Sequence, residues 1–260
     1  MHSVILYLEH LVKAKGRHGV HSPFIYDLIN KVLRPKEAPA ECQEIEAYRR
    51  RLLASERTIP VLDLGAGSRR TKGSLRRVAE VTRTAVKGAR EAMLLYRAVE
   101  HFRPTTVLEL GTSFGISALY MAAAMNSGQV TTLEGCPETL SIARDAFRQL
   151  GHGRITPVQG DFKEKLPAVL AELDRLDLVH LDGHHELDPT LDYFEQCLGR
   201  SHNNTVIIVD DIHWSAGMSE AWSRIKAHPR VTVTVDLYRM GFVFLRTEQS
   251  KEHFTLRYRA

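Results

Sequence analysis

An acidic residue and two glycines lie close together in the stretch Val107-Leu-Glu-Leu-Gly-Thr-Ser-Phe-Gly115, where Glu109, Gly111 and Gly115 are chemically distinctive. Apolar residues flank Glu109, and a helix-forming run follows at residues 116–125. This pattern predicts a strand, a tight glycine turn and a helix N-terminus. In open α/β sheets such a turn presents free backbone N–H groups to a ligand. We therefore expect this stretch to hold the ligand around which the chain is organised.

The side chains that follow Gly111 narrow the kind of ligand. Thr112, Ser113 and Phe114 stand where a dinucleotide-binding loop needs bare glycine backbone beside the pyrophosphate. Glu134 ends the next predicted strand, where its carboxylate can accept hydrogen bonds from both hydroxyls of a ribose. The pattern therefore favours a nucleoside without a pyrophosphate.

A further acid ends the third predicted strand, at Gly160-Asp161. Its carboxylate can accept a hydrogen bond from the exocyclic amine of an adenine. For each of these acids alone, a solvated strand end or a helix cap is an equal alternative. Their recurrence at successive strand ends favours a ligand site.

Three more acids, Asp182, Asp210 and Asp211, end the fourth and fifth predicted strands. Because these strands neighbour the first in a doubly wound sheet, we expect the three carboxylates to converge beside the ligand. Three oxygen ligands favour Mg²⁺ or a similar divalent ion. Such an ion would bind a substrate hydroxyl, lower its pKa and orient it for reaction.

Histidines accompany these acids. His184, His185 and His213 are predicted near the same edge, and a histidine can act as a general base near neutral pH or as a metal ligand. A metal site that includes them leaves Mn²⁺, Fe²⁺ or Zn²⁺ open. We expect at least one of the three to be catalytic, with a structural role as the alternative. Trp214 either lines an aromatic substrate or packs under its own loop, and packing is slightly favoured.

Strands that alternate with helices must position these residues, which predicts a parallel, doubly wound α/β sheet. After the first strand, further strands are expected at 130–134, 155–161, 176–182, 205–210, 231–237 and 241–246. The last two are too close together for a crossover, so they should be antiparallel.

The first 84 residues are predicted to form a helical cap or extension, and residues 85–260 the ligand-binding core. Ser22 and Pro23 are typical of a helix start. The stretch 59–68 also places an acid before two glycines, but polar, glycine-broken residues follow it in place of an apolar helix. We assign it to a structured loop or a short helix cap, with a position over the ligand pocket as the alternative.

The composition, with 43% hydrophobic and 25% charged residues, is that of a globular protein. There is no secretory signal and no apolar run near the roughly 20 residues that span a bilayer, so we expect a cytoplasmic protein. Three scattered cysteines exclude a disulfide framework. Between residues 69 and 90, eight basic residues face a single acid, Glu80. A solvated face or an oligomer contact, such as a homodimer, is the favoured explanation, and attraction of an anionic substrate is the other.

In combination, these motifs make residues 85–260 resemble the class I S-adenosylmethionine (SAM)-dependent methyltransferases. The opening stretch matches their first motif, E-x-G-x-x-x-G, and the paired C-terminal strands match their antiparallel seventh strand. Within the class, the chain is most similar to the catechol and caffeoyl-CoA type of O-methyltransferase. The resemblance implies a Rossmann-like seven-stranded sheet in the order 3-2-1-4-5-7-6 and SAM as the cofactor.

The resemblance also implies roles for individual residues. Glu109, Gly111 and Ser117 would hold the methionine end of SAM, Glu134 its ribose and Asp161 its adenine. The full set expected to bind the cofactor is Glu109, Gly111, Thr112, Ser113, Gly115, Ser117, Glu134, Gly135, Asp161, Phe162, Asp182 and His184.

The chain departs from similar O-methyltransferases at two positions. They carry an aspartate followed closely by a lysine base, and then an Asp-Asn pair. Here Asp182-Gly-His184-His185 places a histidine where that lysine falls, and Asp210-Asp211 replaces the Asp-Asn pair. We therefore expect Asp182, His185 and His213 to be catalytic, and Asp182, Asp210 and Asp211 to bind the metal.

These patterns together predict O-methylation of a small-molecule hydroxyl. A nucleic-acid methyltransferase is less favoured, because the Asn/Asp-Pro-Pro-aromatic motif is absent after the fourth strand, although the basic stretch keeps RNA open. A protein that binds SAM without transferring its methyl group is another alternative. A nicotinamide-dependent oxidoreductase is disfavoured by the loop at 112–114.

Overall fold

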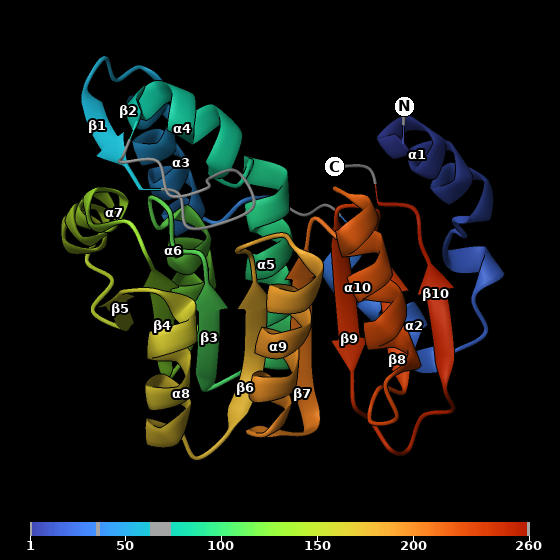
Figure 1. The fold of residues 1–260 in the computed structure, drawn as a ribbon. Coiled ribbons are helices and arrows are strands. Elements are labelled where there is room, and N and C mark those ends of the chain that lie inside the picture. The colour runs from blue at the N-terminus through green and yellow to red at the C-terminus, as the bar shows by residue number, and fades with distance from the viewer. Residues whose placement is uncertain (1, 35–36, 63–73, 259–260) are drawn as a thin grey trace. The chain divides into compact units, whose positions relative to one another are not determined.

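The computed structural model describes residues 2–34, 37–62 and 74–258, and helices alternate with strands along most of this length (Figure 1). The chain divides into two compact units. Unit 1 comprises residues 1–30 and 169–259, and unit 2 comprises residues 31–168. The two compact units do not divide the chain at residue 84. The domain boundary expected at that residue stays a prediction.

Unit 2 contains three parallel strands in the order β3-β4-β5. Its elements are α3 (Ala40–Leu53), β1 (Thr58–Val61), β2 (Ser74–Arg77), α4 (Val78–Ala85), α5 (Ala89–Phe102), β3 (Thr106–Leu110), α6 (Ile116–Ala123), β4 (Gln129–Glu134), α7 (Pro137–Gln149) and β5 (Ile155–Gln159), and α8 (Phe162–Glu172) crosses the unit boundary. Strand β3 is buried from Val107 to Leu110, as expected for a parallel strand that is covered on both faces.

Unit 1 contains five strands in the order β10-β8-β9-β7-β6. Its elements are α1 (His2–Lys13), η1 (Arg17–Gly19), α2 (Pro23–Leu28), β6 (Leu176–Leu181), α9 (Leu187–Leu198), β7 (Ser201–Asp210), α10 (Ala216–Ala227), β8 (Val233–Asp236), β9 (Met240–Phe244) and β10 (Glu252–Thr255), and η2 (Ile29–Leu33) crosses the boundary. Strands β6 and β7 are parallel, whereas β9 is antiparallel to both β7 and β8.

The mostly parallel α/β architecture and the antiparallel C-terminal pair are therefore confirmed. Strand β10, which is parallel to β8, was not expected. It has four residues and a single buried side chain, Phe254, so it carries no alternating pattern that sequence could reveal. The complete order 3-2-1-4-5-7-6 stays a prediction, because it depends on how the two units join.

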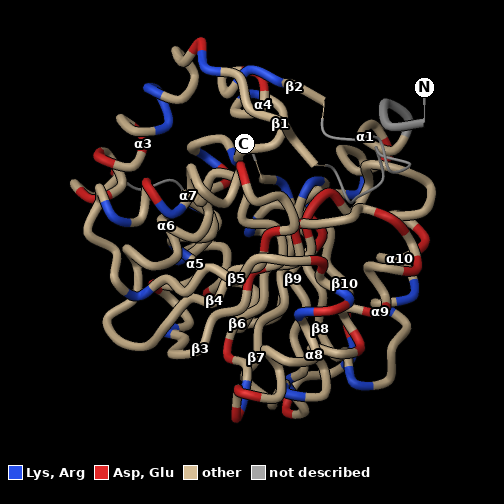
Figure 2. Tube along the Cα trace, turned by 60° about the vertical axis from the view of Figure 1, so that its left-hand side comes forward, with Lys and Arg blue, Asp and Glu red and all other residues tan. Residues whose placement is uncertain are grey.

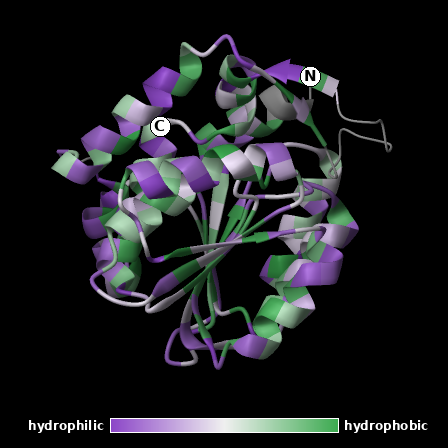
Figure 3. Cartoon of the chain, turned by 90° about the vertical axis from the view of Figure 1, so that its left-hand side faces the viewer, coloured by the Kyte–Doolittle hydropathy of each residue, from purple (hydrophilic) through white to green (hydrophobic). Residues whose placement is uncertain are grey.

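The helices carry both hydrophilic and hydrophobic residues, which Figure 3 colours purple and green. Helix α6 is the most apolar, and every residue from Ile116 to Ala122 is buried. None of the described helices is long and apolar enough to cross a membrane.

The N-terminal helices are shared between the two units. In unit 1, Ser22 caps α2, since its Oγ accepts a hydrogen bond from the Ile25 amide at 3.4 Å, as the sequence predicts. The Phe24 ring then meets the Phe244 ring of β9 edge-on, with centroids 4.9 Å apart. In unit 2, the Tyr96 hydroxyl of α5 donates to Glu41 of α3 at 3.2 Å.

The stretch 59–68 begins with a strand, and its assignment to a loop or helix cap is wrong over residues 59–61. Strand β1 pairs with β2 in an antiparallel hairpin. Strand β2 begins thirteen residues after β1 ends, so no local sequence pattern indicates that the two strands pair. Residues 63–73, which include both glycines of this stretch, lie outside the part of the chain that the structure describes.

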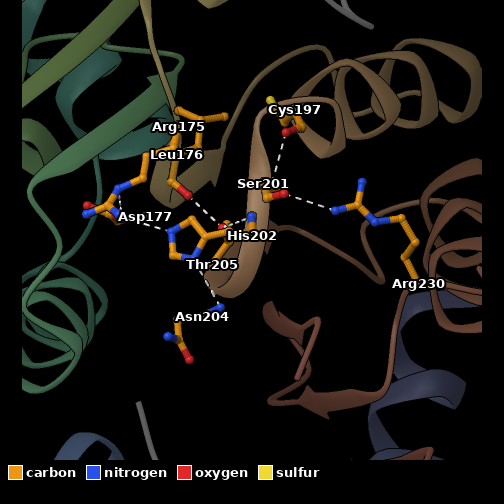
Figure 4. Close-up of polar contacts among 9 residues, drawn as sticks. All are labelled: Arg175, Leu176, Asp177, Cys197, Ser201, His202, Asn204, Thr205 and Arg230. Carbon is orange, nitrogen blue, oxygen red and sulfur yellow. Dashed lines mark hydrogen bonds and ion pairs between the residues drawn. The ribbon is translucent and has the colours of Figure 1, made fainter. Parts of the chain in front are cut away.

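Polar contacts fix the beginnings of β6 and β7 against each other (Figure 4). The Thr205 hydroxyl donates to the Leu176 carbonyl at 2.6 Å and accepts from the His202 amide at 2.8 Å. His202 Nε2 lies 2.9 Å from Asp177 Oδ1. Arg230 donates to the Ser201 carbonyl at 3.0 Å. These contacts therefore stabilise the pairing of β6 and β7 where the two strands begin.

A glycine at the start of β4 permits a close backbone approach. Gly128 has φ +92°, and an added Cβ would overlap the Thr105 carbonyl oxygen. We expect Gly128→Ala to lower the free energy of unfolding by about 3 kcal/mol or more, through strain and overlap together. Gly151→Ala is the matched control, because Gly151 has φ +70° and no atom within 4 Å of an added Cβ. The control should lose about 1 kcal/mol. Equal losses in urea unfolding of both variants would contradict this account.

Candidate active site

The glycine loop of unit 2 is held by backbone hydrogen bonds. The amides of Gly111 and Thr112 both donate to the Leu133 carbonyl of β4, at 3.0 and 3.2 Å. Gly111 and Ser113 have positive φ, at 104° and 47°. The loop then closes through a hydrogen bond from the Gly115 amide to the Thr112 carbonyl at 2.8 Å. The predicted strand, glycine turn and helix start are confirmed here.

Gly115, the second glycine, is required for packing. It is the N-cap of α6 with φ +80°, and an added Cβ would overlap the Phe147 ring of α7. Its lack of a side chain lets α7 pack tightly behind the loop. Gly111 thus permits the shape of the turn, and Gly115 permits the close approach of α7.

Glu109 is fully buried beneath this loop. Its Oε2 accepts a hydrogen bond from the Thr132 hydroxyl at 2.6 Å, and the Thr112 and Thr132 hydroxyls lie 2.6 Å apart. Because the Thr132 proton goes to the carboxylate, Thr112 must be the donor in the second bond. The sequence prediction missed Thr132, although a threonine in an otherwise apolar buried strand is a recognisable signal. Direct contact of Glu109 with a ligand stays a prediction.

Glu134, at the end of β4, is already oriented by the loop. Its Oε2 accepts from the Ser113 amide at 2.8 Å and its Oε1 accepts from the Cys136 amide at 2.9 Å. Burial raises the pKa of Glu134, against hydrogen bonds from Cys136, Ser113, Thr139 and Gly135 that lower it. The Glu134 carboxylate is therefore fixed in position at the end of β4 by the backbone around it.

Asp161 caps the helix that follows it. Its Oδ1 accepts a hydrogen bond from the Lys163 amide at 2.8 Å, which is the helix-cap alternative. A ligand contact of Asp161 stays a prediction. Because β3, β4 and β5 are adjacent and parallel, unit 2 brings together at one edge the predicted residues that follow these strands: Gly111, Thr112, Ser113, Gly115, Ser117, Glu134, Gly135, Asp161 and Phe162.

The hairpin strand β1 ends beside this edge. The Leu62 amide, just after β1, lies 3.3 Å from the Cys136 sulfur, two residues beyond Glu134. Cys136 is buried at the start of α7. This neighbour of Glu134 could not be found from the sequence, since 74 residues separate the contacting pair. It places the end of β1 beside the predicted ribose position.

In unit 1, the loop after β6 contains Asp182, His184 and His185. His185 Nε2 lies 3.7 Å from Asp182 Oδ1, and His184 Nδ1 lies 3.0 Å from the Tyr193 hydroxyl. Both histidines have positive φ, at 66° and 36°. Left-handed backbone at non-glycine residues costs about 1–3 kcal/mol each and clusters at functional sites. The backbone therefore supports a functional role for this loop.

The loop after β7 contains the remaining predicted residues. Asp210 is buried, and Asp211 has φ +50°. His213 Nε2 lies 2.7 Å from Asp236 Oδ2 of β8. Trp214 is 69% exposed, so the expectation that it packs under its loop is wrong. The Trp214 amide donates a hydrogen bond to the Asp211 carbonyl and closes a turn. Within this turn, Ile212 is the residue that is buried in the core.

The predicted metal ligands do not gather into a metal site. Among the residues that the structure describes, no group of three or more His, Cys, Asp or Glu side chains is arranged to hold a metal ion. Asp182 is instead paired with His185. The assignment of Asp182, Asp210 and Asp211 as metal ligands therefore stays a prediction.

Most of the described residues of the basic stretch are exposed. Arg76 and Arg77 on β2 and Arg83 on α4 are all exposed, and Figure 2 shows blue residues along β2. Arg69, Arg70 and Lys72 lie outside the described residues. Exposure agrees with a solvated face, and the homodimer and the anionic acceptor stay predictions.

Comparison with known proteins identifies the family. A family model described as a methyltransferase domain matches residues 108–212. Catechol O-methyltransferase from Sus scrofa is 30% identical over 131 residues, which cover 48% of this chain and 69% of that protein.

Two solved structures show the same fold. An O-methyltransferase from Bacillus cereus in complex with SAH aligns with a TM-score of 0.56 and 20% identity, over 85% of this chain and 97% of that one. The O-methyltransferase TomG from Streptomyces achromogenes, in complex with SAM, aligns with a TM-score of 0.59 and 15% identity, over 85% and 95% of the two chains. The chain belongs to the class I SAM-dependent O-methyltransferase family.

Proposed function

We propose that this protein transfers the methyl group of SAM to a hydroxyl group of a small molecule. The observation that carries the proposal is the geometry of Glu134, whose carboxylate is held by the glycine loop at the end of β4. The relationship to catechol O-methyltransferase supports a hydroxyl as the acceptor.

Unit 2 supplies the groups that SAM requires. The Glu134 carboxylate accepts hydrogen bonds from the ribose hydroxyls, and the Asp161 carboxylate accepts a hydrogen bond from the adenine amine. The N-terminus of α6, which begins at Ile116 after the loop, offers backbone N–H groups to the carboxylate of the methionine end. The loop at 112–114 lacks the middle glycine with which a dinucleotide-binding loop approaches a pyrophosphate.

The transfer itself needs a base. As the acceptor oxygen bonds to the methyl carbon, the carbon–sulfur bond breaks and the sulfonium becomes a neutral thioether. The hydroxyl proton must leave, and a histidine can take it near neutral pH. His185 follows β6 and lies beside Asp182, and His213 follows β7 and lies beside Asp236 of β8.

The proposal includes a divalent ion, with Mg²⁺ favoured, that assists the reaction. If present, it would supply Lewis-acid activation of the hydroxyl. Asp182, Asp210 and Asp211 remain the residues proposed to hold it, although their present arrangement does not form a ligand set.

The cofactor assignment is tested by Glu134→Gln. Losing a charged acceptor should raise the Kd for SAH about 10- to 100-fold, as expected for one or two charge-assisted hydrogen bonds. Isothermal titration of the full chain measures the affinity, with Glu44→Gln as the control because Glu44 is exposed on α3 of the same unit. Unchanged SAH binding by the Glu134 variant, or binding of NAD(H) in place of SAH, would refute the assignment.

The difference in SAH affinity between the wild type and Glu134→Gln should depend on pH in a defined direction. Because burial raises the pKa of Glu134, its carboxylate takes up a proton at a higher pH than a free glutamate would. The wild-type advantage over Glu134→Gln should be full at neutral pH. It should shrink as the pH falls towards the raised pKa, and the loss should begin at a higher pH than a free glutamate would give.

Chelation distinguishes two ways of deprotonating the acceptor hydroxyl, one assisted by a metal ion and one by a histidine. Turnover with 3,4-dihydroxybenzoate is compared before EDTA, after EDTA and after Mg²⁺ is restored. A metal-assisted reaction should fall at least about tenfold in EDTA and recover with Mg²⁺. A histidine-based reaction should survive EDTA and lose about 10²-fold or more in kcat in His185→Ala or His213→Ala. Full activity of both histidine variants in EDTA would contradict both routes.

A further inference from the structure

A chain of hydrogen-bonded side chains lies beneath the glycine loop of unit 2. Thr132 on β4 is the residue directly opposite Glu109 in the parallel pair that β4 forms with β3. Its hydroxyl donates to Glu109 Oε2 at 2.6 Å and lies 2.6 Å from the Thr112 hydroxyl. All three side chains are at most 1% exposed. Thr132 therefore connects the acid of β3 to the first side chain of the loop.

The chain of hydrogen bonds runs in one direction. A hydroxyl has one proton to donate, and Thr132 donates its proton to Glu109, so it can only accept from Thr112. Glu109 and Thr112 thus depend on the same oxygen atom. Replacing that oxygen by a methyl group would remove a donor from Glu109 and an acceptor from Thr112 at the same time.

The fold alone does not require these three polar side chains. Val107 and Leu108 of β3 and Leu133 of β4 are fully buried around them. Removing polar groups from water is costly, and apolar residues of similar shape in place of both partners of a buried pair are often equally stable. The hydrogen bonds are therefore better explained by a requirement of the loop than by a requirement of the core.

The loop contains backbone that a fixed Thr112 would stabilise. The Thr112 carbonyl accepts from the Gly115 amide at 2.8 Å, which closes the turn before α6. The next residue, Ser113, has φ +47° and donates its amide to Glu134 at 2.8 Å. Strained backbone of this kind persists only where surrounding contacts compensate for it. A loop that is held in shape beforehand also loses less conformational freedom when it binds a ligand.

The two ends of the cofactor should depend on Thr132 to different extents. Glu109 and the N-terminus of α6 are expected at the methionine end, and the loop joins these two elements in the sequence. Glu134 is expected at the ribose, and its carboxylate is also fixed by the Cys136 amide at 2.9 Å, which lies outside the loop. Loss of the Thr132 hydroxyl should therefore affect the methionine end most.

We propose that Thr132 is a positioning residue for the methionine end of SAM. Its hydroxyl orients the Glu109 carboxylate by donating to it, and fixes the glycine loop by accepting from Thr112. This inference rests on the proposed function, and it gives a part in cofactor binding to a residue that is fully buried beneath the loop.

Thr132→Val tests the proposal, because valine keeps the shape of the side chain and lacks the hydroxyl. Isothermal titration of the full chain measures the Kd for SAH and for methylthioadenosine, which lacks the amino and carboxyl groups of SAH. We expect the Kd for SAH to rise about 10- to 100-fold, the usual effect of leaving a buried polar group without its partner, and the Kd for methylthioadenosine to change less than about threefold. Equal losses for both ligands, or unchanged SAH binding, would overturn the proposal.

Two further variants show whether the hydroxyl itself is responsible. Thr132→Ser keeps the hydroxyl and should leave the Kd for SAH within about threefold of the wild-type value. Thr131→Val makes the same change one residue earlier on β4, where the side chain points to the opposite face of the sheet, and should leave both affinities unchanged. A serine variant as weak as the valine variant, or an equal loss in Thr131→Val, would contradict the role of the hydroxyl.

Amide hydrogen exchange, followed by NMR, reports on the loop directly. In the wild type without SAH, the Ser113 and Gly115 amides should exchange at least about tenfold more slowly than amides without hydrogen bonds, and Thr132→Val should remove most of this protection. Unprotected amides in the wild type would overturn the proposal even where the valine variant fails to fold. Failure of the wild type to bind SAM or SAH counts against the proposed function, and the exchange rates then still decide whether Thr132 holds the loop.

Discussion

A carboxylate that is removed from water must find hydrogen-bond donors, and this constraint shapes both units of the protein. In unit 2, Glu109 is met by the hydroxyl of Thr132 on the neighbouring strand, and Glu134 by backbone amides of the loops around it. In unit 1, Asp236 accepts hydrogen bonds from the Trp222 indole and the Tyr238 amide, and it lies 2.7 Å from His213 and 3.1 Å from His10. Each acid thus ties together segments that are distant in sequence and fixes the side chains nearest the proposed chemistry.

Backbone strain is concentrated in the same places. Non-glycine residues with positive φ recur in loops that follow strands: Ser113, His184, His185, Asp211 and Tyr238. Such conformations persist only where surrounding contacts compensate for them. The Ser113 amide donates to Glu134, His184 meets Tyr193, and the Tyr238 amide donates to Asp236. The hydrogen bonds that satisfy the polar side chains therefore also stabilise the turns that present the functional residues.

Local pattern was sufficient for most of the fold. Apolar strands followed by helices predicted the alternating α/β architecture, and the short connection between β8 and β9 predicted their antiparallel pairing. The glycine loop and the cap at Ser22 were also recognisable, because turns and helix starts depend on neighbouring residues. Strands β1, β2 and β10 were missed, since each is four residues long and exists through pairing with another segment.

For the candidate site, residue types and spacing alone determined the acids at the strand ends, the nucleoside-like ligand and the histidines near them. Only the tertiary structure decided that Glu109 accepts a hydrogen bond from Thr132, that Trp214 is exposed, and that His213 lies against Asp236 of β8. The reason is physical. Strand, turn and cap preferences arise within a few residues, whereas the partner of a buried charge is whichever donor the packing of remote segments brings within 3 Å or so.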